Sequence, residues 1–195
     1  MRDFIRELIE TALLSVAVFL VLHLSVQNFR VEGSSMVPTL TEGQYIIANK
    51  IIYSSVSIDT LAGFLPFIQT SGKGESLYTF HPPEYGEIII FNFPSDQSRD
   101  LVKRVIGVPG DTIEIQSGQV IRNGEPIEEP YVVNKDRRTY DPVEVPENSY
   151  YVLGDNRRSS SDSRDWGFLS DEHVVGRAWI GYWPMDSIGV LQAFR

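Results

Sequence analysis

The most prominent pattern in the chain is an apolar run near its N-terminus. No charged residue occurs over positions 11–29, and the run ALLSVAVFLVLHLSV fills most of that window. At 1.5 Å per residue, a helix of this length can cross the hydrocarbon core of a bilayer. The pattern predicts a transmembrane anchor over residues 11–29. Because Arg2 and Arg6 precede the run, residues 1–10 are expected in the cytoplasm and residues 30–195 outside it.

Two other interpretations of this run are weaker. A cleaved signal sequence is disfavoured because the acidic residues Asp3, Glu7 and Glu10 precede the run, and no small-x-small exit lies before Arg30. A buried helix of a soluble protein is disfavoured because no polar face interrupts the apolar positions. The anchor is therefore retained as the prediction.

After the anchor the dominant pattern changes to period two and to short apolar runs. Such segments occupy residues 45–52, 87–93, 111–115, 119–127, 150–155 and 174–183. Turn signals separate them, among them SG at 117–118 and NG at 123–124. The fold class predicted is mainly β, as one domain over residues 30–195 with one N-terminal transmembrane helix.

Two segments interrupt the β pattern. Residues 54–85 form a loop insertion with an apolar centre bounded by glycine and serine, and either core covering or contact with lipid headgroups would explain it. Residues 129–149 form an irregular polar excursion.

Composition excludes several classes of function. The net charge is −9 and no block of lysine and arginine occurs, which argues against a nucleic-acid surface. The chain has no cysteine, so a thiolate metal site and a cysteine nucleophile are excluded. Only three histidines are present, which argues against a histidine-rich metal site and leaves a serine nucleophile few histidines to serve as its base. We therefore expect no metal and no cofactor.

Four segments carry candidate chemistry: GSSMVPTL (33–40), GEIIIFNFP (86–94), LVKRVIGVPGD (101–111) and GDNRRSSSDSRDWG (154–167). Each alone is ordinary turn, strand or polar loop. Together they favour a serine hydrolase with a lysine base, because a lysine shielded from water can replace histidine.

Lys103 is the candidate base, since it lies between Val102 and the apolar run VIGVPG. Lowering a lysine pKa from about 10.4 to about 8 requires roughly 3 kcal/mol of destabilisation of its charged form, which partial burial can supply. Side chains alternate along a strand, so Arg104 is expected to point the opposite way and to pair with an acid.

The four motifs, in this order, resemble those of the type I signal peptidases, the membrane-bound Ser/Lys endopeptidases that remove signal peptides from exported proteins. The resemblance runs from the apolar segment to GRAWIGYWP and suggests a compact bacterial form. It implies a serine endopeptidase without a cofactor, acting on the signal peptides of exported pre-proteins. The implied location is an inner, plasma or thylakoid-type membrane, in contact with the lipid bilayer and near the secretion translocon.

The resemblance also implies roles for single residues. Ser35, the serine directly before methionine, corresponds to the nucleophile, in place of its neighbour Ser34, and its backbone amide to an oxyanion donor. Lys103 corresponds to the general base. Ser35 lies five positions after Arg30, a reach of about 17 Å, so the nucleophile is expected close to the outer membrane face.

In the last motif, Ser160 corresponds to the serine that orients the lysine, while Asp162 and Arg164 correspond to a structural ion pair beside the site. The segment between the lysine motif and GDNR is short, so the accessory region over residues 112–150 is expected to be reduced.

The substrate backbone in this family pairs as an added strand, and shallow apolar pockets receive alternate side chains. The residues expected to bind substrate are Gly33, Ser34, Met36, Leu101 and Val102. Gly33 is also a departure, because some relatives carry a serine here whose hydroxyl is the second oxyanion donor. A backbone amide, a water molecule or Ser34 could take that role.

Two other functions compete with this interpretation. A catalytically inactive membrane assembly or binding module of the same fold would have no need for both Ser35 and Lys103. A self-cleaving repressor-type Ser/Lys protease would need a soluble DNA-binding region, where this chain has an apolar run instead.

Overall fold

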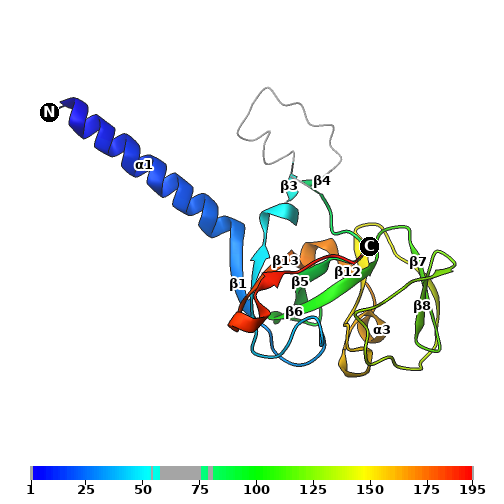
Figure 1. The fold of residues 1–195 in the computed structure, drawn as a ribbon. Helices are drawn as coiled ribbons and strands as arrows, with labels where there is room; N and C mark the ends of the chain where they lie inside the picture. The colour runs from blue at the N-terminus through cyan, green and yellow to red at the C-terminus, as the bar shows by residue number, and fades with distance from the viewer. Residues whose placement is uncertain (1, 54, 58–75, 79–80, 195) are drawn as a thin grey trace.

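The computed structural model describes residues 2–53, 55–57, 76–78 and 81–194. A long N-terminal helix, α1 (Arg2–Ser25), projects from a β domain (Figure 1). In the described residues no helix combines the length and the apolarity that a membrane crossing requires, so the predicted spanning anchor is not confirmed.

The apolar run is not a single helix. The α1 helix already includes nearly all of residues 1–10, and it ends at Ser25. Strand β1 (Val26–Arg30) then pairs antiparallel with β2 (Tyr45–Asn49). The helix thus ends four residues before the predicted end of the anchor at residue 29, because the last residues of the run form backbone hydrogen bonds to a neighbouring strand.

The main sheet of the described residues has the order β1-β2-β13-β5-β6-β11-β12, with β14 beside β13. Its further strands are β5 (Ile88–Phe93), β6 (Asp96–Gly107), β11 (Ser149–Leu153), β12 (Leu169–Ser170), β13 (Val174–Trp183) and β14 (Gly189–Val190). The mainly β fold is thus confirmed.

Strand β5 shows why the sheet has apolar side chains on both faces. Ile88 and Ile90 belong to one buried cluster, with Met36, Leu40 and Ala48. Ile89 and Phe91 belong to another on the opposite face. Because successive side chains of a strand alternate between faces, a strand buried on both sides is continuously apolar, as IIIF is.

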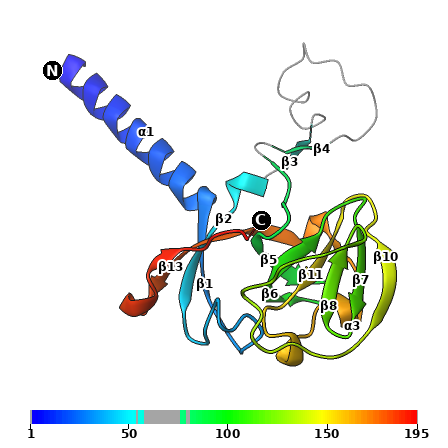
Figure 2. The ribbon, with the colours of Figure 1, turned by 45° about the vertical axis from the view of Figure 1, so that its right-hand side comes forward.

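A smaller sheet lies beyond β11 and β6 (Figure 2), in the order β10-β7-β8-β9. Its strands are β7 (Thr112–Gln116), β8 (Gln119–Arg122), β9 (Glu125–Pro126) and β10 (Tyr140–Glu144). The predicted turn signals are present, since Ser117 and Asn123 have φ angles of 48° and 55°, each before a glycine with positive φ. Ile113 and Ile115 pack with Leu153 and anchor this sheet to the main one.

Within the predicted insertion 54–85, β3 (Ser55–Ser57) pairs with β4 (Ser76–Tyr78). The apolar centre of the insertion lies outside the described residues. Short 3-10 segments occupy Ile51–Tyr53, Arg157–Ser159, Asp171–His173 and Met185–Ser187, and the short helix α3 spans Ser163–Trp166.

Candidate active site

Ser35 lies in the turn segment between β1 and β2, and its neighbours hold that segment in place. Met36 and Leu40 are 1% and 0% exposed and pack into the core with Val31. The Leu40 amide donates to the Met36 carbonyl at 2.9 Å, which closes the turn. The serine is therefore presented by a segment that is fixed on its inner side by apolar packing.

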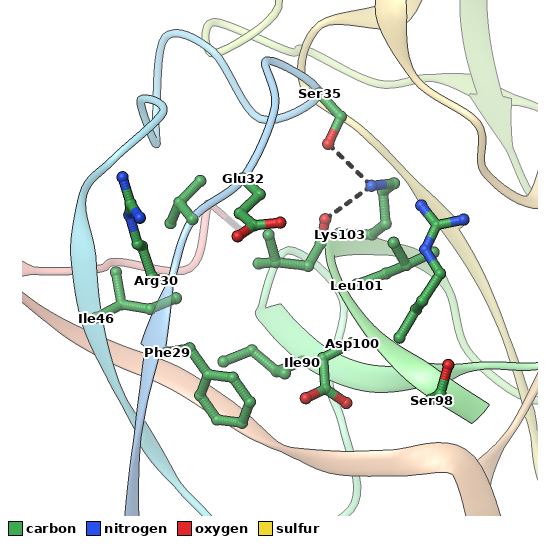
Figure 3. A pocket seen from close by; sticks show the side chains of 13 residues that line it. Phe29, Arg30, Glu32, Ser35, Ile46, Ile90, Ser98, Asp100, Leu101 and Lys103 are labelled. Atoms are coloured by element: carbon green, nitrogen blue, oxygen red, sulfur yellow. Dashed lines mark hydrogen bonds between the residues drawn. The ribbon is translucent and has the colours of Figure 1, made fainter. Parts of the chain in front are cut away.

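Lys103 lies on β6, opposite Ile89 of β5, and is only 3% exposed. Its Nζ forms hydrogen bonds with Ser35 Oγ and with the Val102 carbonyl oxygen, both at 2.9 Å (Figure 3). The sheet thus brings together the two residues expected to form the catalytic pair, although 68 positions separate them in sequence.

Burial lowers the pKa of Lys103 from its ordinary 10.5 to about 8. Desolvation of the ammonium is the main cause, while the charges of Asp162 and Asp155 act in the opposite direction. Near pH 8 a substantial fraction of the amine is therefore neutral and able to accept a proton.

Arg104, the next residue, pairs with an acid as expected, but inside the protein. Its Nε and Nη2 donate to the two carboxylate oxygens of Asp155 at 2.9 and 2.7 Å, and Nη1 donates to the Gly86 carbonyl at 2.9 Å. The guanidinium carbon lies 3.9 Å from the centroid of the Tyr131 ring. This charge is compensated by hydrogen bonds and by an aromatic face.

Sequence reasoning missed the roles of Asp155 and Asn156. The Asn156 amide donates to the Ser35 carbonyl at 2.9 Å, and its Nδ2 donates to the Ser34 carbonyl at 3.1 Å. Thr39 Oγ1 donates to Asp155 at 2.5 Å. Polar residues directly after a buried strand were the available signal, and these contacts attach the Ser35 turn to the end of β11.

Ser160 lies beside the Ser35 turn and, within the described residues, forms no hydrogen bond to Lys103. A Cβ atom at Gly154 would lie 2.2 Å from Ser160 Oγ and 2.6 Å from the Ser35 carbonyl oxygen, so only glycine allows this approach. The Ser160 Oγ is buried and has no hydrogen-bond partner among the described residues. The expected contact with the lysine is not among the hydrogen bonds of Lys103 in this part of the chain.

Residues 157–162 are called the Ser160 loop. At its end, Asp162 and Arg164 form a two-pronged ion pair, with both nitrogen–oxygen distances at 2.7 Å. Asp162 also accepts the Gly154 amide at 3.0 Å and caps α3. Arg164 donates further to the Arg157 carbonyl at 2.9 Å. The pair therefore ties the end of β11 to the loop and to the helix after it.

A cavity of about 330 Å³ opens beside Ser35 and Lys103, between β1 and β6 (Figure 3). Its apolar walls come from Phe29, Val31, Ile46, Ile90, Leu101 and Val102. Its polar lining includes Arg30, Glu32, Ser98, Arg99 and Asp100. Below it is called the first cavity.

Of the residues expected to bind substrate, Leu101 and Val102 line the first cavity, whereas Gly33, Ser34 and Met36 do not. Met36 is buried in the core because the turn directs it inward. Gly33 has a φ of 77°, which explains a glycine there on conformational grounds. Ser34 is exposed. In the described ranges, no group of His, Asp and Glu residues could hold a metal ion.

The known proteins that are similar to this chain are named as signal peptidases. The family described as "Signal peptidase, peptidase S26" matches residues 5–183. "Probable signal peptidase I-1" of Synechocystis sp. is 31% identical over 200 residues, covering 98% of this chain and 89% of that protein. "Signal peptidase I" of Leptolyngbya laminosa is 33% identical over 190 residues, covering 91% and 81%. A crystal structure of a signal peptidase I from Enterococcus faecalis V583 covers 50% of this chain and 97% of its own, with 30% identity and a TM-score of 0.46.

Proposed function

Because the chain belongs to the signal peptidase family, peptidase S26, we propose that it cleaves signal peptides from exported pre-proteins with a dyad of Ser35 and Lys103. It is a serine peptidase and thus a hydrolase. The observation that carries the dyad is the 2.9 Å distance between Lys103 Nζ and Ser35 Oγ, with the amine almost fully buried.

In the proposed reaction, neutral Lys103 removes the proton from the Ser35 hydroxyl while Oγ attacks the carbonyl carbon of the scissile bond. The resulting ammonium then protonates the leaving amine, and the signal peptide remains as an ester on Ser35. Water, deprotonated by the same lysine, hydrolyses the ester and restores both residues. The Ser35 backbone N–H is the proposed donor to the oxyanion.

Ser160 is proposed to position the lysine amine during the reaction. This proposal is supported by its buried hydroxyl, which has no partner in the described residues and approaches the Ser35 carbonyl across Gly154. A small rotation of the amine on substrate binding would supply the missing partner. Asp162 and Arg164 support this loop and do not react.

The first cavity is proposed to receive substrate residues that precede the scissile bond. The substrate strand would lie between the end of β1 and β6, with alternate side chains directed at the apolar wall. Leu101 and Val102 belong to that wall, next to Ile46 and Ile90. A cavity of about 330 Å³ that also holds the backbone leaves room only for small side chains.

Helix α1 is proposed to anchor the protein in a membrane, with the N-terminus cytoplasmic and the β domain outside, near the secretion translocon. Its apolar side chains are exposed along its length: Leu13, Leu14 and Phe19 are 64%, 65% and 65% exposed. Such side chains require a partner, and lipid is the partner that suits a helix projecting from its domain (Figure 1). Alkaline carbonate extraction of membranes tests this, since a peripheral protein would be released.

The rival function is a catalytically inactive module of the same fold. The retained contact between Lys103 and Ser35 and the lowered lysine pKa favour the enzyme. The test is incubation of the purified full chain with a pre-protein that has alanine at the third and first positions before its cleavage site. N-terminal sequencing should show cleavage after the second alanine, and an intact pre-protein would favour the inactive module.

A further inference from the structure

A second cavity, of about 660 Å³, lies next to the Ser160 loop. Four basic residues line it, Lys135, Arg137, Arg138 and Arg158, together with Asp136, Asp165 and Ser160. Four cationic and two anionic side chains give the cavity a charge of +2, in a chain whose net charge is −9. The sign of the cavity is therefore opposite to that of the protein.

The two aspartates do not neutralise the whole cluster. Arg138 lies 2.8 Å from Asp136 and 3.8 Å from Asp165, and Asp136 also accepts from Arg164 at 2.6 Å. Lys135, Arg137 and Arg158 are exposed, and no ion pair joins them to any other described residue.

The second cavity adjoins the Ser160 loop, which lies beside the Ser35 turn, and it shares no lining residue with the first cavity. Arg158 and Ser160 lie two and four positions after Asn156, which binds the backbone of Ser34 and Ser35. The first cavity is built instead by β1 and β6, and Ser35 and Lys103 lie at its end (Figure 3). A substrate strand that fills the first cavity and crosses Ser35 therefore continues toward the Ser160 loop.

We propose that the second cavity binds acidic side chains of the pre-protein just after the scissile bond, an inference that rests on the proposed function. Guanidinium groups match the planar carboxylates of Asp and Glu. On this proposal, the apolar walls of the first cavity select the residues before the scissile bond, and the basic side chains of the second cavity select those after it. Because each ion pair at an exposed site contributes little, we expect about a threefold effect on kcat/KM.

The test compares peptides that differ only at the second and third positions after the scissile bond, which are both Glu, both Gln or both Lys. With the full chain in neutral detergent at low salt, kcat/KM should follow the order Glu, Gln, Lys. The double variant R137Q/R158Q should abolish the preference for Glu. R30Q/R99Q is the matched control, because it likewise removes two positive charges, but from the first cavity; whatever its effect on the overall rate, it should leave the Glu-to-Gln ratio unchanged.

Binding separates this inference from the proposed function. With Ser35→Ala, fluorescence anisotropy should show tighter binding of the Glu peptide than the Gln peptide, and the R137Q/R158Q substitutions should equalise the two. If no peptide is cleaved, the proposed function is wrong. The ratio of the affinities for the Glu and Gln peptides still tests whether the second cavity binds acidic side chains. Equal rates and equal binding for Glu and Gln would overturn the inference. Loss of binding to phosphatidylglycerol vesicles in R137Q/R158Q, with those equal rates, would assign the cavity to the membrane surface instead.

Discussion

The guanidinium of Arg104 and the carboxylate of Asp155 form a two-pronged ion pair in which both side chains are 0% exposed. Arg104 follows Lys103 on β6, and Asp155 precedes Asn156, which binds the backbone of Ser35. The pair therefore connects the strand that carries the proposed base to the loop that holds the proposed nucleophile. We expect it to fix the distance between Lys103 and Ser35 without taking part in the proposed reaction.

Asp155→Asn should destabilise the fold by about 3–5 kcal/mol, because it leaves the buried Arg104 charge without its counter-ion. Urea unfolding measures the change. Glu10→Gln is the control, since it breaks the exposed pair with Arg6 and should cost less than about 1 kcal/mol. Unfolding midpoints that fall equally in both variants would contradict the role given to the buried pair.

Cleavage should rise with pH through an apparent pKa of about 8, the value to which burial lowers Lys103. The base acts only when neutral, so the rate falls as the amine becomes protonated below this pH. Lys103→Arg should be inactive over the whole range because arginine stays charged. A rate that stays constant from about pH 6 to about pH 9, a range that spans the lowered pKa of Lys103, would refute the base role. An active Lys103→Arg protein would refute it too.

Lys103→Met should abolish cleavage and yet stabilise the fold at neutral pH. The folded pKa of about 8 lies below the ordinary 10.5, so the unfolded chain binds the proton more tightly. Lys103 therefore destabilises the folded state by roughly 3 kcal/mol, from which the hydrogen bonds that methionine cannot form must be subtracted. This destabilisation is fully present below the folded pKa of about 8 and disappears as pH rises through the unfolded pKa. Thermal unfolding of both proteins at two pH values measures it. A methionine variant that is less stable at neutral pH would contradict the cost assigned to burial of the amine.

Val102→Ala should widen the first cavity, since Val102 belongs to its apolar wall. The unaltered protein should cleave substrates with Ala at the first position before the bond far faster than those with Val or Leu. The variant should recover part of the rate for the larger side chains. Initial rates for the three substrates decide this, and equal cleavage of Ala and Leu substrates by the unaltered protein would exclude a small pocket.

Local patterns were sufficient to predict much of the fold. Period-two segments and turn signals indicated a mainly β domain, and the apolar neighbours of Lys103 indicated its burial. The end of the helix at Ser25 could not be predicted from the sequence. The apolar run continues without a helix-ending signal, and it becomes a strand only because β2 pairs with it. Only the proximity of Met36 to Ser35 in the sequence suggests a role in substrate binding, whereas the turn directs its side chain into the core.

Contacts between distant segments were harder to predict. Asp155 and Arg104 are separated by 51 positions, and Asn156 and Ser34 by 122. The local sequence around each of these residues does not indicate which distant residue it contacts. The second cavity was missed for the same reason, because it forms only where residues 135–138 meet residues 158–165.

The most direct test of the dyad compares two neighbouring serines. Ser35→Ala should abolish cleavage of the pre-protein, because it removes the hydroxyl that lies 2.9 Å from Lys103 Nζ, and should leave the unfolding temperature nearly unchanged. Ser34→Ala, which alters an exposed side chain one position away, should retain most of the rate. An active Ser35→Ala protein together with an inactive Ser34→Ala protein would contradict the account.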